Sequence, residues 1–301
     1  MAEGAAGHAG GPVTWGRDGP VVTWLHGYTM DSRIWPPVWA LLPEFVHVGI
    51  DLPGHGRSPA LPSSASIDDW AEQVERVMRA RSSRLLVALC MGTMVAAQVV
   101  MRGRIRLDGI VLVAPALVGM EEDLLTANRF GSLALKAWRG VGPAELADVW
   151  MRPPSAMFDG MARYPDRLAG LRAVIAEHTW PGLADGGAMA FRGPPQTVEQ
   201  VVAAAADSGP LLLVSGGRDM RPQRETAVAL ADRVAGAEFV DLPELGHLPI
   251  LEAPAAVTPA VGRFLTGCAR HTVARKSAST ATPNSTAATG TRSSTPWKSR
   301  P

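Results

Sequence analysis

Residues 85–92 of the chain read Leu-Leu-Val-Ala-Leu-Cys-Met-Gly, and this short segment decides the predicted fold. An apolar run without alternation is typical of a strand that is covered on both faces, as in a parallel sheet. The pattern that follows favours a helix over about 91–101, so Cys90 lies at a tight turn from strand to helix. Such a turn needs small residues two positions before and after its centre, and Ala88 and Gly92 meet that need. Cys90 is therefore the candidate nucleophile.

Outward from this segment, short apolar strands alternate with helical stretches. Further strands are predicted over 21–25, 46–52, 110–113, 211–214 and 238–242, and helices over about 32–42, 66–81 and 254–265. Strands and helices that alternate at this spacing indicate βαβ units and hence an α/β fold with a mostly parallel sheet.

The rhythm is interrupted between residues 119 and 208, where helical patches over 124–138, 143–151 and 165–178 occur without a convincing strand. We predict that 119–208 is a helical lid inserted into a core formed by 13–118 and 209–267. Residues 1–12 are rich in Gly and Ala and are expected to be flexible. Residues 268–301 are rich in Ser, Thr and Ala and are expected to form a disordered tail.

Composition limits the classes of partner and compartment. The chain has 301 residues, 47% of them apolar, and a net charge of +1. The tail holds six Lys or Arg and no acid, so the rest carries −5, which argues against nucleic acid as a partner. Two cysteines make no disulfide framework, and neither a signal peptide nor an apolar stretch of about 18 residues is evident, so we expect a cytoplasmic protein that does not bind membranes. No His or Cys pair has metal-ligand spacing, so no metal or cofactor is expected.

Three further motifs carry a family resemblance. Residues 25–28 read Leu-His-Gly-Tyr, residues 51–58 read Asp-Leu-Pro-Gly-His-Gly-Arg-Ser, and Cys90, Asp219 and His247 follow one another in the order nucleophile, acid, histidine. From about residue 21 to 265 the chain thus resembles the α/β-hydrolase superfamily, in which that order is usual. The resemblance implies an α/β-hydrolase fold, a triad of Cys90, His247 and Asp219, and an oxyanion hole from the backbone N–H groups of Met91 and Tyr28.

Each assigned role has a structural alternative. Cys90 would be a small apolar core residue, His247 a loop histidine, and Asp219 a cap for the helix that starts near residue 222. Some cysteine members take their acid from the end of the preceding strand, but residues 114–116 read Ala-Pro-Ala and no acid occurs before Glu121. Asp219 is therefore preferred. The histidines and the aspartate of the two conserved-looking loops, His26, His55 and Asp51, are expected to be structural.

Cysteine at the turn distinguishes this chain from plain serine esterases. In this respect the chain resembles dienelactone hydrolases, polyhydroxyalkanoate synthases and stand-alone Dieckmann cyclases. Three hypotheses follow: release of an acyl chain to water, release by an internal carbon nucleophile with closure of a tetramate-type ring, or a non-catalytic binding module that kept the fold. A thioester exchanges readily with carrier thioesters, which favours a small-molecule acyl substrate, free or on a carrier protein. A simple ester or lactone hydrolase remains the alternative. Trp138, Trp150 and Phe158 of the lid are the candidate substrate-binding residues.

Overall fold

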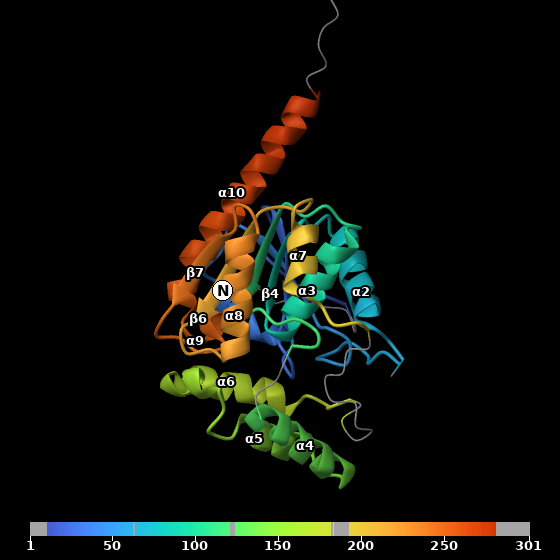
Figure 1. Cartoon of the computed structure of the whole chain (residues 1–301), viewed down its shortest axis with the longest axis vertical. Coiled ribbons are helices and arrows are strands. Elements are labelled where there is room, and N and C mark those ends of the chain that lie inside the picture. The colour runs from blue at the N-terminus through green and yellow to red at the C-terminus, as the bar shows by residue number, and fades with distance from the viewer. Residues whose placement is uncertain (1–10, 63, 121–123, 182, 184–192, 281–301) are drawn as a thin grey trace, which may run out of the picture.

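A seven-stranded sheet forms the centre of the computed structural model, which describes residues 11–280 apart from 63, 121–123, 182 and 184–192 (Figure 1). The strand order is β1-β3-β2-β4-β5-β6-β7, and every neighbouring pair is parallel except β1 and β3. The bounds are Val13–Trp15, Val21–Leu25, Val46–Ile50, Leu85–Leu89, Gly109–Val113, Leu211–Gly216 and Glu238–Leu242 for β1 to β7. The predicted α/β class and mostly parallel sheet are confirmed.

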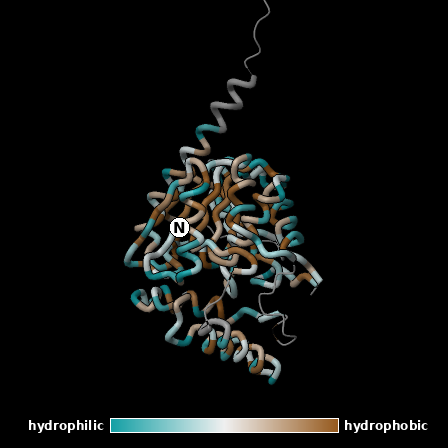
Figure 2. Tube along the Cα trace, viewed as in Figure 1, coloured by the Kyte–Doolittle hydropathy of each residue, from teal (hydrophilic) through white to brown (hydrophobic). Residues whose placement is uncertain are grey.

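The central strands explain the unbroken apolar runs of the sequence. Every residue of β4, β5 and β6 is buried, whereas β7 at the sheet edge has exposed residues. In Figure 2 the brown, apolar segments accordingly gather in the middle of the molecule. Leu89 pairs with Val113, and Val113 with Val214, so these three strands end at the same edge of the sheet. That edge is where parallel α/β sheets carry their sites.

Helices cover both faces of the sheet. On one face α2 (Ile67–Ala80), α3 (Met91–Arg102), α7 (Val198–Ala205) and α8 (Arg221–Arg233) pack side by side in that order. On the other face α1 (Pro36–Trp39) and α9 (Pro249–Glu252) contact α10 (Pro254–Thr280). None of the described helices is long and apolar enough to cross a membrane.

Local sequence explains most of these boundaries. Ser66 and Asp69 form the predicted capping box of α2, with the Asp69 carboxylate 2.7 Å from the Ser66 N–H. The helix predicted over 32–42 is instead a 3₁₀ turn, η1 (Ser32–Ile34), followed by the single turn of α1. Pro36 and Pro37 lack the N–H groups that one continuous helix would need. Strand β1 was not predicted because three residues are too few to show a period.

The lid forms a separate group of helices at one end of the molecule (Figure 1). It contains α4 (Leu124–Trp138), α5 (Pro143–Met151), the 3₁₀ turn η2 (Asp159–Arg163) and α6 (Pro165–Ala176). Its neck is closed by Val118 and Gln196: the Gln196 N–H donates to the Val118 carbonyl at 2.9 Å, and the Val118 N–H donates to Gln196 Oε1 at 3.0 Å. The predicted lid boundary at residue 208 is therefore too late, because α7 lies beyond this neck and packs between α3 and α8.

The predicted end of the folded part at residue 267 is too early. Helix α10 continues to Thr280 and leaves the body at the end opposite to the lid (Figure 1). Cys268 is only 5% exposed and packs against Gly109 at the amino end of β5. The segments 1–10 and 281–301, for which flexibility and disorder were predicted, lie outside the described residues.

Candidate active site

Cys90 occupies a strained turn between β4 and α3. Its backbone has φ 51° and ψ −120°, a conformation that residues with a Cβ rarely adopt and that is typical of a nucleophile in this fold. Its N–H donates to the Val113 carbonyl at 3.0 Å, so β5 holds the turn. Gly92 is required here, because an added Cβ would lie 2.7 Å from the carbonyl oxygen of His26. The predicted turn, with small residues before and after it, is present.

Thr93 braces this turn and was not singled out in the sequence. Its hydroxyl lies 2.5 Å from the Cys90 carbonyl and accepts the N–H of Ala116 at 2.8 Å. The side chain thereby connects the first turn of α3 to the segment after β5. A threonine three residues after the candidate nucleophile was the available signal, but many helices begin with such a residue.

His247 and Asp219 meet at the edge of the sheet where the strands end. His247 Nδ1 donates to Asp219 Oδ1 at 2.7 Å, and both side chains are fully buried. Burial lowers the pKa of His247, but the charges of Asp219 and Cys90 and the hydrogen bond to Asp219 outweigh burial and hold that pKa well above its usual value. The other ring nitrogen, Nε2, is buried and has no further partner among the described residues. An imidazole that is paired through one nitrogen and unpaired at the other has the arrangement that a triad histidine would need.

The loop that carries His247 is held by a buried acid that the sequence reading did not single out. Glu252, in α9, accepts the N–H of Gly246 at 2.7 Å and the N–H of Leu248 at 3.0 Å. The available signal was that Glu252 is the only charged residue between positions 245 and 256.

The two predicted oxyanion-hole positions belong to segments that lie next to Cys90. Met91 is the first residue of α3, and the first N–H groups of a helix have no partner within the helix. Tyr28 follows β2 in a loop that approaches the nucleophile closely, since a Cβ on Gly27 would lie 3.3 Å from the Cys90 Cβ. These positions suit backbone donors aimed at an oxyanion.

The other residues of the two loops are structural, as expected. His26 Nδ1 donates to the Gly27 carbonyl at 2.8 Å, and its Nε2 accepts the Leu52 N–H at 2.9 Å, so this ring joins the loops after β2 and β3. The Asp51 carboxylate accepts the Ser32 N–H at 2.9 Å and the Arg57 N–H at 3.0 Å. His55 donates from Nδ1 to the Pro53 carbonyl at 2.9 Å.

Two of the three predicted substrate-binding residues reach the core, and one does not. Trp150 donates to the Thr29 hydroxyl at 3.1 Å, and its ring centroid lies 5.6 Å from Tyr28 and 5.9 Å from Phe158. Tyr28 also contacts the rings of Phe130, His178 and Trp180, so the lid is seated on the oxyanion loop through an aromatic cluster. Trp138, at the end of α4, is 72% exposed and so cannot contribute to a buried acyl site.

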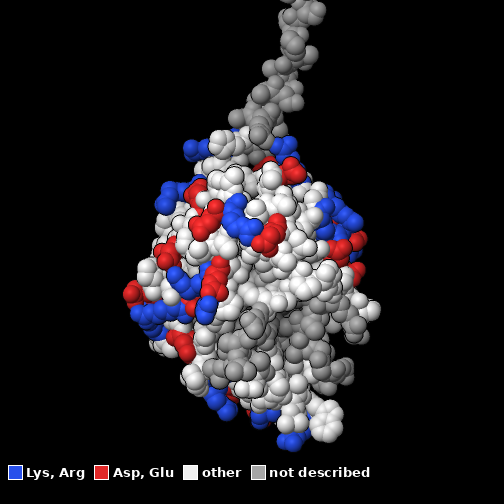
Figure 3. Space-filling view, in the orientation of Figure 1, with Lys and Arg blue, Asp and Glu red and all other residues white. Residues whose placement is uncertain are grey.

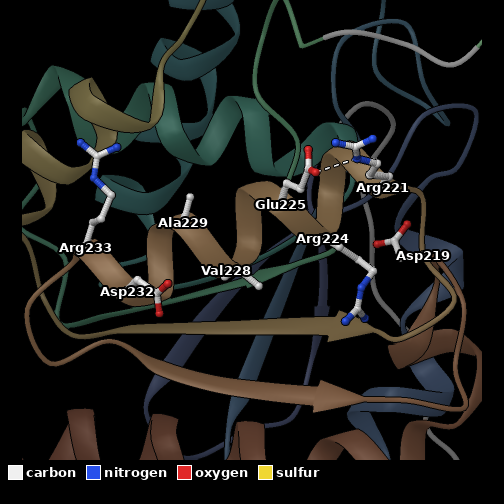
Figure 4. A pocket seen from close by; sticks show the side chains of 8 residues that line it. All are labelled: Asp219, Arg221, Arg224, Glu225, Val228, Ala229, Asp232 and Arg233. Atoms are coloured by element: carbon white, nitrogen blue, oxygen red, sulfur yellow. Dashed lines mark hydrogen bonds and ion pairs between the residues drawn. The ribbon is translucent and has the colours of Figure 1, made fainter.

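A surface pocket beside α8 can be set aside as the substrate site. It has a volume of about 730 Å³, and Asp219 lies at one end of it, next to the start of α8 (Figure 4). Its arginines are already paired: Arg221 with Glu225 at 2.7 Å, Arg224 with Asp241 at 3.1 Å and Arg233 with Glu199 at 2.6 Å. Both signs of charge are also interspersed over the face drawn in Figure 3. Among the described residues no His, Cys, Asp and Glu side chains group as a metal site.

Comparison with known proteins identifies the family. The profile of the Alpha/beta hydrolase family matches residues 24–260, most of the chain, so the chain belongs to that family. The family and the relatives described below make this chain an enzyme of the hydrolase class.

Two curated relatives illustrate the range of activities. A 2-succinyl-6-hydroxy-2,4-cyclohexadiene-1-carboxylate synthase of Yersinia enterocolitica is 31% identical over 173 residues, which cover 56% of this chain and 61% of that protein. A pimeloyl-[acyl-carrier protein] methyl ester esterase of Nitrosospira multiformis is 26% identical and covers 82% of this chain and 95% of its own length.

Solved structures share the fold. MenH from S. aureus has a TM-score of 0.71 at 18% identity and covers 85% of this chain and 97% of its own. A thermophilic esterase from Thermogutta terrifontis has a TM-score of 0.71 at 24% identity, and the match covers 88% of this chain and 97% of the esterase. At these identities the likeness concerns the fold alone.

Proposed function

We propose that this chain transfers acyl groups through a thioester on Cys90, with His247 as the proton carrier and Asp219 as the residue that orients His247. The observation that carries the proposal is the 2.7 Å contact between His247 and Asp219, at the edge of the sheet where Cys90 occupies its strained turn. Three residues from three separate loops would not converge in this way for packing alone. This convergence also argues against a non-catalytic binding module.

The first step is formation of the acyl-enzyme. The thiol of Cys90, at a helix N-terminus and beside His247, gives its proton to His247 and attacks the carbonyl carbon of an acyl thioester or ester. The N–H groups of Met91 and Tyr28 stabilise the resulting oxyanion. When the intermediate collapses, the bond to the leaving thiol or alcohol breaks, and His247 gives that group its proton.

The second step decides the product. In hydrolysis His247 takes a proton from water, the hydroxide attacks the thioester carbon, and a free acid leaves Cys90. In a Dieckmann cyclisation His247 takes the acidic proton between the two carbonyls of a β-ketoacyl group. The resulting carbanion attacks the thioester carbon, the bond between that carbon and the Cys90 sulfur breaks, and the tetramate-type ring closes as the Cys90 thiolate leaves and takes the proton back from His247.

The chemistry of the site supports chain release and leaves ring closure open. A thioester carbonyl is more susceptible to carbon nucleophiles than an oxygen ester, and the buried aromatic cluster on Tyr28 restricts water near the loop. Similarity to the Nitrosospira pimeloyl-[acyl-carrier protein] methyl ester esterase supports an acyl substrate that a carrier protein presents. Simple ester or lactone hydrolysis, as in dienelactone hydrolases, is the second candidate because the same acyl-enzyme would serve it.

The deciding experiment measures the product mass from an N-(β-ketoacyl)aminoacyl thioester, with Cys90→Ala as the control. A product lighter than the free acid by one water identifies a cyclase. The free acid identifies a thioesterase-like hydrolase. Turnover of this thioester and of simple esters that survives in Cys90→Ala would overturn the acyl-enzyme proposal.

A further inference from the structure

Glu252 is a buried carboxylate without an ion-pair partner in the described structure. It is 1% exposed and ends the short helix α9, five residues after His247. Burying a carboxylate costs several kcal/mol unless hydrogen bonds compensate. The cost of burying Glu252 must therefore be offset by the hydrogen bonds that its two carboxylate oxygens accept.

Both carboxylate oxygens bind the backbone on either side of His247. Oε2 accepts the N–H of Gly246 at 2.7 Å, and Oε1 accepts the N–H of Leu248 at 3.0 Å. These are the peptide groups immediately before and after His247. Hydrogen bonds to an ionised acceptor are about twice as strong as neutral ones. One side chain thus fixes the backbone from which the imidazole projects, while Asp219 fixes the ring.

The lid covers the other side of this carboxylate. Gly160, in η2, lies so close that an added Cβ would be 2.5 Å from Glu252 Cδ. A Cβ on Gly246 would in turn be 3.0 Å from the Gly160 Cα. Arg167, in α6 of the lid, donates to the main-chain carbonyl of Glu252. The lid therefore packs directly on the residue that holds the histidine loop.

We infer that Glu252 is a positioning residue for His247 and that Gly160 links the seating of the lid to it. With the lid seated, the Glu252 carboxylate is confined between Gly160 and the loop, and His247 stays aligned with Cys90. This inference rests on the proposed function of Cys90 and His247. A purely structural Glu252 would support folding without affecting the reactivity of Cys90.

The test compares Glu252→Gln with Glu75→Gln. Glutamine keeps the size of the side chain but turns an NH₂ group toward one of the two backbone N–H groups, so that two donors face each other. Glu75 is a matched control: it is a fully buried carboxylate, paired with Arg102 at 2.8 Å in the contact between α2 and α3. The readouts are kcat and KM for p-nitrophenyl butyrate and the pH profile of Cys90 alkylation by iodoacetamide, followed by peptide mass.

We expect kcat to fall about 10- to 100-fold in Glu252→Gln with little change in KM, since small misplacements of a catalytic group cost that much. Alkylation of Cys90 should also become slower across the pH series, because His247 is no longer held beside the thiol. Glu75→Gln should lower the melting temperature but leave both kcat and the alkylation of Cys90 unchanged. If both variants behave alike, Glu252 is merely structural and the inference is overturned.

A second pair of variants tests the lid link and does not depend on Glu252→Gln folding. Gly160→Ala pushes a methyl group into the carboxylate, whereas Gly170→Ala, in α6 of the same lid, meets nothing within 4 Å. We expect Gly160→Ala alone to lower kcat and to shift the alkylation profile. Equal behaviour of the two would overturn the link. If His247→Ala leaves the alkylation profile of the otherwise unchanged chain intact, the proposed function itself fails.

Discussion

The two cysteines of the chain lie at opposite ends of the same strands and have opposite surroundings. Both thiols are free and buried, with Cys90 8% and Cys268 5% exposed. Cys90 follows the carboxyl end of β4, whereas Cys268 packs on Gly109 at the amino end of β5. Residue type and burial are thus nearly the same at both sites, and only the environment differs.

That environment decides how each thiol can react. Burial, with the negative charges of Glu238 and Asp108, raises the pKa of Cys268 to about 11, so this thiol stays neutral in the physiological range. Cys90 instead lies at the start of α3, with His247 beside it, which are the surroundings expected of a nucleophilic cysteine. A buried cysteine is therefore reactive or inert according to the charges around it, which neither composition nor burial reveals.

The largest expected effect comes from removing each thiol. Cys90→Ala should lower turnover of an acyl thioester roughly 10³-fold or more, because loss of one triad member removes most of the catalysis that the triad supplies. Cys268→Ala should stay within about twofold, since it alters only core packing. Steady-state rates with melting temperatures as a folding control decide this, and equal losses in both variants would remove the assignment of Cys90.

A smaller effect is expected when the sulfur alone is changed. Cys90→Ser keeps the geometry but replaces a thiolate by a hydroxyl that His247 must deprotonate, so rates on a thioester should fall about 100-fold. Cys268→Ser is the matched substitution at the other site and should leave the rate nearly unchanged. Full activity in Cys90→Ser would show that the thiolate is dispensable and that the enzyme acts as an ordinary esterase.

Alkylation contrasts the two sites without a substrate. At pH 7 iodoacetamide should label Cys90 at least ten times faster than Cys268, because a thiol with a pKa of about 11 is almost entirely protonated there. Labelling of Cys268 should increase only as the pH rises toward 11. Since the pKa of His247 is raised, its imidazolium persists at neutral pH and is lost only as the pH rises through that raised pKa. Peptide masses measured over a pH series report both sites, and faster labelling of Cys268 would contradict the comparison.

The smallest effects are expected at the end of α10. Deleting residues 268–301 removes the buried Cys268 and should lower the free energy of unfolding by about 1–3 kcal/mol, as a core truncation does. Deleting only 281–301 should change the melting temperature by about a degree or less. Neither deletion should alter kcat, because this end lies opposite to the lid (Figure 1). A loss of activity in the shorter deletion would show a role for the tail that the comparison does not anticipate.

Much of the fold was readable from residues whose signal is local. The strands β2, β4 and β7 have the predicted bounds, and α4 and α5 coincide with the helical patches of the lid. A run of buried apolar residues or a capping box depends on neighbours along the chain, so such elements can be predicted. Strand β1 could not be predicted in this way, because its three residues form a strand only by pairing with β3.

Boundaries that depend on distant contacts were mispredicted for the same reason. The neck of the lid is set by hydrogen bonds between Val118 and Gln196, which lie 78 positions apart. The extent of α10 depends on the fit of Cys268 against Gly109. Trp138 and Trp150 are alike as sequence signals, yet one is exposed and the other donates to Thr29. No local pattern distinguishes these two tryptophans.

The candidate site also has features that local sequence predicts and features that only tertiary contacts decide. The identity of Cys90, Asp219 and His247, and their order on the chain, follow from motifs that local geometry requires: a small-residue turn and loops after parallel strands. Their meeting depends on strand register, and the hold of Glu252 on the histidine loop depends on side chains that converge only in three dimensions. Sequence reports which groups can do the chemistry, because chemistry belongs to residue types. Folding decides which of them meet, because hydrogen bonds and burial depend on distances in space.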